Sequence, residues 1–182
     1  MVPAATNKGN HQSASGVSAM LIIPELKNRL TDNDRSFNTL TRTIALSQGC
    51  FSLLLVNCNC RETQERAIEK LSNFHKVQSL TLPQSIETLY NFIQTKVAAR
   101  GELNQVSPLA GLCICGLESV SSQDKLLRDA NFMRDRFPGA FPFPLILWVN
   151  DEVHIKLIRL APDFENIATS GIYFAPEPLK QN

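Results

Sequence analysis

Residues 51–71, FSLLLVNCNCRETQERAIEKL, decide the fold of this chain. The first six of them are almost all apolar, as expected for a strand that is covered on both faces of a sheet. From residue 61 the sequence becomes charged, and Ala67, Ile68 and Leu71 recur at the spacing of one helix face. The stretch therefore predicts a buried strand, a short turn and an amphipathic helix.

The same alternation continues towards the carboxyl end of the sequence. Further strands are predicted at residues 77–82, 109–117, 145–149 and 172–174, and further helices at residues 85–100, 121–137 and 151–160. Strands that alternate with helices are joined by right-handed crossovers, which make a parallel sheet with helices on both faces. We therefore predict an α/β fold, a three-layer α/β/α sandwich around a mainly parallel five-stranded sheet.

The amino-terminal part of the chain has a different composition. Residues 1–20 are rich in Ala, Ser, Asn and Gly and lack the apolar block of a secretory signal, so a disordered tail is expected there. Residues 21–182 are expected to form a single α/β domain. Within it, residues 21–30 suit a short amphipathic helix and residues 31–34 suit a turn. A second helix, on Phe37, Leu40, Ile44 and Leu46, should end at Gly49.

Composition excludes several classes of function. The formal net charge is +1, so no broad field attracts nucleic acid or anionic lipid. No apolar run approaches the length needed to span a membrane. The five cysteines are an odd number and four lie in apolar runs, which favours reduced thiols. A cytoplasmic protein without nucleic-acid or membrane partners is expected.

Ligands of parallel α/β sheets bind at the carboxyl ends of the strands. Residues 57–63 follow the first predicted strand, where a triphosphate-binding protein places a glycine-rich loop with a lysine. This segment has neither glycine nor lysine. A helix amino terminus remains, which attracts anions, and Asn57, Asn59, Arg61 and Thr63 are the candidate nucleotide contacts. A plain structural turn is the favoured interpretation.

Two more polar residues follow predicted strands. Glu118 stands where a triphosphatase holds magnesium or polarises water, although an exposed acid before a helix is the favoured interpretation. Asn150 stands where a side chain senses the terminal phosphate, and helix capping is favoured for it.

Cysteines and aromatic residues offer further candidates. Cys58 and Cys60, like Cys113 and Cys115, are spaced to share one face of a strand, but a zinc site would require those two strands to be neighbours. Packing in the core is the favoured interpretation, and no metal is expected. The aromatic segment 137–143 either folds over the edge of the core, as favoured, or forms an exposed docking patch.

The set of strand ends resembles a known family. Residues 51–59 (FSLLLVNCN), 116–120 (GLESV), 143–151 (FPLILWVND) and 157–164 (LIRLAPDF) are similar to the amino-terminal domain of bacterial, especially cyanobacterial, tetratricopeptide-repeat multidomain proteins. That domain is related to the signal-transducing P-loop ATPases with numerous domains. The resemblance implies a P-loop-NTPase-like sheet, in which the fourth strand separates the first from the third. Active members carry a complete phosphate loop, and many relatives have lost it.

Two functions follow from this resemblance. In the first, the chain is a catalytically degenerate NTPase-like domain that acts as a protein-interaction or regulatory signalling module, with tetratricopeptide-repeat or effector domains as partners. It then needs no cofactor, and weak binding of ATP and magnesium stays open. In the second, a divergent ATPase uses Arg61, Thr63, Glu118 and Asn150 as phosphate contact, magnesium ligand, water polariser and sensor. The missing lysine favours the first, because that charge stabilises phosphate and the transition state.

Overall fold

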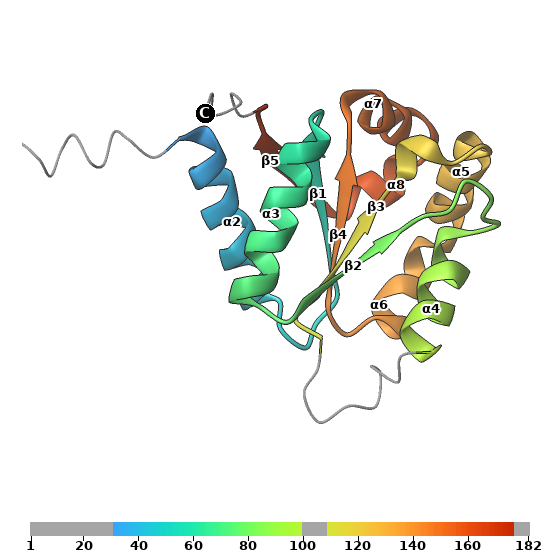
Figure 1. Ribbon diagram of the computed structural model, residues 1–182. Coiled ribbons are helices and arrows are strands. Elements are labelled where there is room, and N and C mark those ends of the chain that lie inside the picture. Colours follow the sequence, from blue (N-terminus) through green and yellow to red (C-terminus); the bar gives the residue numbers. More distant parts are fainter. Residues whose placement is uncertain (1–30, 100–108, 177–182) are drawn as a thin grey trace, which may run out of the picture. The chain divides into compact units, whose positions relative to one another are not determined.

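A computed structural model describes residues 31–99 and 109–176 of the chain (Figure 1). The predicted tail, residues 1–20, and the predicted helix, residues 21–30, lie outside the described residues. The described strands are β1 (Ser52–Cys58), β2 (Val77–Thr81), β3 (Gly111–Cys115), β4 (Pro144–Val149) and β5 (Ala168–Phe174). They form one sheet in the order β2-β3-β4-β1-β5, and every neighbouring pair is parallel. The predicted five-stranded parallel sheet is thus confirmed.

Helices cover both faces of this sheet. They are α2 (Asp32–Leu46), α3 (Arg61–Phe74), α4 (Leu89–Ala99), α5 (Gln123–Met133), α6 (Phe137–Ala140), α7 (Asp151–Leu160) and α8 (Pro162–Asn166), with the short 3-10 turns η2 (Leu117–Ser119) and η3 (Arg134–Arg136). Helices α2 and α3 pack on one face, and α4, α5 and α7 pack on the other. No helix among the described residues is long and apolar enough to cross a membrane.

Strand β1 shows why the sequence is almost continuously apolar. Leu53 and Leu55 point into the core under α4, α5 and α7, whereas Leu54 and Val56 point into the core under α2 and α3. Side chains alternate between the two faces of a strand, so a strand buried on both faces needs apolar residues at every position. The same holds for β4, whose residues are all buried.

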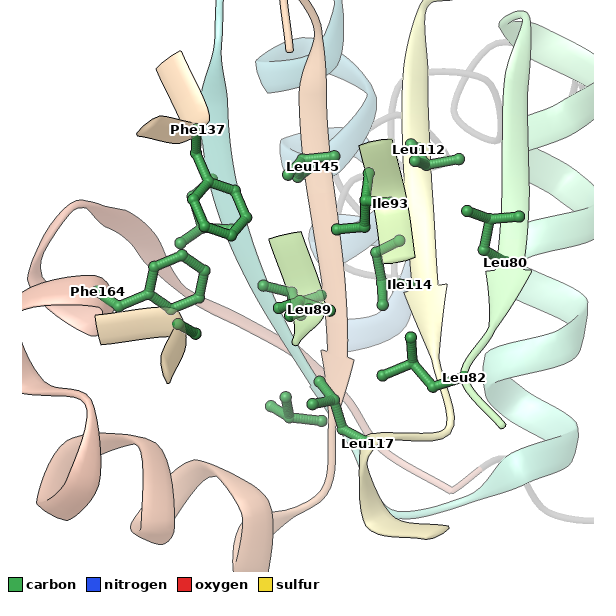
Figure 2. Close-up of a cluster of buried hydrophobic side chains, with 14 of the residues drawn as sticks. Leu80, Leu82, Leu89, Ile93, Leu112, Ile114, Leu117, Phe137, Leu145 and Phe164 are labelled. Carbon is green, nitrogen blue, oxygen red and sulfur yellow. The ribbon is translucent and has the colours of Figure 1, made fainter. Parts of the chain in front are cut away.

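The predicted aromatic segment folds over the edge of the core, as favoured. Phe137, Phe141 and Phe143 are all buried, and Figure 2 shows the ring of Phe137 beside that of Phe164 from α8. The two ring centroids are 5.1 Å apart. An exposed docking patch of these rings is therefore excluded.

The turn predicted at residues 31–34 is wrong, because α2 begins at Asp32. Acidic residues in a first helical turn interact favourably with the helix dipole, so the same residue types that favour turns also start helices. Of the four residues on which this helix was predicted, Phe37, Leu40 and Ile44 are buried, whereas Leu46 is 77% exposed. The chain turns away after Leu46, and Gly49 has a positive φ of 75°, which confirms the predicted stop.

Other helix boundaries also differ from those predicted from the sequence. Helix α4 begins at Leu89 and not at residue 85, and the Thr88 hydroxyl accepts a hydrogen bond from the backbone N–H of Asn91, which marks Thr88 as the cap. The helix predicted over 121–137 ends at Met133 and is followed by η3 and α6. Helix α8 was not predicted, and Pro162 stands in its first turn, a position that suits proline.

Candidate functional site

The carboxyl edge of the sheet opens onto a cavity of about 550 Å³, which we call the α3–β2 cavity. Its floor includes Ser79 and Thr81 of β2 and Cys115 of β3. Its wall is formed by the exposed side of α3, and its rim by residues that follow β1, β3 and β4. The cavity therefore lies at the edge where parallel α/β sheets bind their ligands.

Four of the six residues predicted for the site line this cavity. They are Asn59, Arg61, Glu118 and Asn150. The other two are not among its lining residues: Asn57 borders a smaller apolar cavity between β1, β5 and α7, and Thr63 is only 2% exposed. The roles predicted for these residues remain predictions, but the structure brings most of them together.

A polar clamp closes the turn between β1 and α3. The side-chain amides of Asn57 and Asn59 donate to the two carboxylate oxygens of Asp151, at 2.8 and 2.7 Å. The backbone N–H of Asp151 donates in return to the side-chain oxygen of Asn59, at 3.0 Å. These contacts join the turn to the first turn of α7. Sequence patterns do not indicate this role of Asp151, because a contact between positions so far apart leaves no local signal.

The clamp shifts the acidity of its carboxylate. Hydrogen bonds from Asn59 and Asn57 stabilise the charged form and hold the pKa of Asp151 below its ordinary value. The stabilisation is therefore present above the pKa that Asp151 has in the unfolded chain, and it is lost as the pH falls through the lower pKa of the folded state.

This shift predicts how an Asp151→Asn variant depends on pH. The variant should be less stable than the wild type at neutral pH, because the NH2 group that replaces one carboxylate oxygen is a donor and would face the amide donor of Asn57 or Asn59. The difference between the two proteins should shrink as the pH falls below the ordinary range of aspartate. Melting temperatures measured across the acid range check this, with Asp129→Asn on α5 as control. A difference that stays constant with pH would contradict the clamp.

The amino terminus of α3 is already occupied by side chains of the protein. The Arg61 guanidinium lies 2.8 Å from the Glu65 carboxylate, and this contact raises the pKa of Arg61. The carboxylate of Glu62 accepts from the Cys60 thiol at 3.1 Å and from its own backbone N–H, and these contacts lower its pKa. A bound anion would have to compete with this internal carboxylate for the end of the helix.

The charges around the α3–β2 cavity are mostly negative. Arg61 is the one cationic side chain among its lining residues, against the carboxylates of Glu65, Glu69 and Glu118. The formal charge of the lining is therefore −2. A triphosphate carries several negative charges of its own, so the lining opposes its binding.

Asn150 caps a helix, whereas Glu118 is exposed at the rim of the cavity. The side-chain oxygen of Asn150 accepts from the backbone N–H of Val153 at 2.8 Å, which confirms Asn150 as the cap of α7. Glu118 is exposed in η2, at the rim of the cavity. It follows Gly116, which has a positive φ of 85°.

Of the cysteines in the two predicted pairs, Cys58 and Cys113 are buried, whereas Cys60 and Cys115 are half-buried. Burial raises the pKa of Cys113 to about 12 and that of Cys115 to about 11. Strand β4 lies between β1 and β3, so the pairs are on strands that are not neighbours. Across residues 31–99 and 109–176, no group of three or more His, Cys, Asp and Glu side chains could hold a metal ion.

Comparison with known proteins gives no family for this chain. No protein-family model matches it, and no curated protein matches it significantly. The structure itself shows a parallel α/β domain with a five-stranded sheet.

Proposed function

We propose that this domain is a catalytically degenerate relative of the P-loop NTPases, which acts as a protein-interaction or regulatory module. The strand order supports this origin, because β4 separates β1 from β3 as the resemblance implies. The clamp carries the proposal, because the segment that would surround a phosphate is closed by the carboxylate of Asp151.

The turn also lacks the glycines on which a phosphate-binding nest relies. A nest of amides around a phosphate relies on residues with positive φ, which glycine adopts at little cost. The described glycines with positive φ are Gly49, Gly116 and Gly171, all outside residues 57–63. Cys60, directly before α3, is extended with a φ of −118°. The turn therefore offers no glycine for such a nest and no lysine beside it.

Three of the four residues that a divergent ATPase would need are buried or already bonded to other groups of the protein. Arg61 is paired with Glu65, Thr63 is buried, and Asn150 caps α7. Only Glu118 is exposed and without a hydrogen bond or ion pair in the described part of the chain. The geometry supports the non-catalytic function better. Tetratricopeptide-repeat or effector domains are the partners that we propose, on the resemblance of the strand ends alone.

Titration with Mg–ATP tests this function. We expect the melting temperature to stay constant up to millimolar Mg–ATP, because the cavity is acidic and its turn is clamped. A nucleotide present at 100 times its dissociation constant would stabilise the fold by about 2.7 kcal/mol, which differential scanning fluorimetry detects easily. Magnesium alone is the control for metal effects. A melting temperature that rises with Mg–ATP, and that falls back in Glu118→Gln, would contradict the proposal.

A further inference from the structure

The two faces of β2 are covered unequally. Leu80 lies in the core under α4 and α5, whereas Ser79 and Thr81 on the opposite face are exposed. Strands of parallel sheets are normally covered on both faces. On this face Val77 of β2 is buried in the core under α2 and α3, and the α3–β2 cavity lies beside Ser79 and Thr81, which that core leaves exposed.

The uncovered surface combines carboxylates with apolar side chains. Glu69 on the α3 wall and Glu118 on the rim have no hydrogen bond or ion pair within the described residues. Ile68 also lines the cavity, and Trp148 borders it although its side chain is only 1% exposed. The hydroxyl groups of β2 add hydrogen-bonding capacity to the floor.

We propose that the α3–β2 cavity docks a basic segment of a partner protein, with an arginine or lysine head against Glu69 and Glu118. The formal charge of −2 favours a cationic occupant and opposes nucleotides and nucleic acid. Long basic side chains also have apolar stems, which suit the half-buried surface of Ile68. This inference rests on the proposed interaction function and names the chemistry of the partner.

A model peptide tests the charge requirement directly. A short capped peptide of alternating arginine and alanine is titrated into the full chain at low salt and followed by fluorescence anisotropy. We expect binding that weakens steeply with added salt. The double variant E69Q/E118Q should bind roughly tenfold more weakly, as expected for the loss of two exposed ion pairs. The control E87Q/D129N changes the net charge equally but outside the cavity, and it should bind like the wild type.

Cysteine protection in the wild-type chain places the peptide independently of any variant. Cys115 lines the cavity, whereas Cys50 is exposed and lies outside it. Bound peptide should slow the alkylation of Cys115 and leave that of Cys50 unchanged, as resolved by mass spectrometry.

Several outcomes overturn the docking site. They are no binding, equal loss of affinity in both double variants, or tight binding that leaves Cys115 unprotected. A peptide of alternating glutamate and alanine that binds as well would also overturn it. These outcomes leave the proposed function standing, because that function is contradicted separately by stabilisation with Mg–ATP.

Discussion

Replacing Phe137 with alanine is expected to lower the free energy of unfolding by about 3–5 kcal/mol. The ring is 0% exposed. Its centroid lies 5.4 Å from that of Tyr90 and 5.6 Å from that of Phe141. The centroid of Phe164, whose ring lies beside it in Figure 2, is 5.1 Å away. Removing it leaves a cavity among α4, α6 and α8 that rigid neighbours cannot fill. Urea denaturation measures the loss.

A matched substitution on the neighbouring helix controls for the loss of a phenylalanine as such. Phe132 of α5 is 82% exposed, so Phe132→Ala should change the stability by no more than about 0.5 kcal/mol. Equal losses in the two variants would mean that Phe137 does not organise this side of the core.

Gly116→Ala should destabilise the fold by about 1–3 kcal/mol, because it combines backbone strain with crowding. Gly116 has a φ of 85°, and an added Cβ would lie 3.2 Å from the Thr81 side chain and 3.3 Å from the carbonyl oxygen of Leu82. Since Gly116 and Thr81 both line the α3–β2 cavity, the change should also disturb its floor. Thermal and urea unfolding measure the loss.

Gly49→Ala separates the two causes. Gly49 has a similar φ of 75°, but nothing lies within 4 Å of an added Cβ. This control should lose only the backbone contribution of about 1–2 kcal/mol. Equal losses at both glycines would contradict the crowding at Gly116.

The sheet could be predicted from sequence because its physical signal is local. A strand that is buried on both faces must be apolar at every position, and residues 51–56 and 145–149 are nearly so. Helix α3 is equally clear, since Ala67 and Leu71 are buried on one face of an otherwise charged segment.

The elements that were missed depend on contacts between distant parts of the chain. The side chain of Asn131 on α5 accepts hydrogen bonds from the backbone N–H groups of Asp163 and Phe164, and so caps α8. Asn33 on α2 exchanges two hydrogen bonds with the backbone of Ala175, next to the end of β5. Neither partner can be identified from local periodicity.

The candidate site also combines features with a local sequence signal and features that depend on long-range contacts. Its position at the strand ends and the absence of glycine and lysine from residues 57–63 are properties of the sequence. The clamp cannot be predicted from the sequence, because Asn59 and Asp151 are separated by 92 residues. The excess of carboxylates around the cavity also becomes visible only when α3 is placed beside β2.

The most direct test of the central claim is a crystal structure determined with magnesium and a non-hydrolysable ATP analogue at high concentration. We expect no ordered phosphates against residues 57–63, and the contacts of Asp151 with Asn57 and Asn59 should be unchanged. Ordered phosphates at that turn, with Asp151 displaced from both amides, would contradict the proposal that this sheet has lost its means of holding a triphosphate.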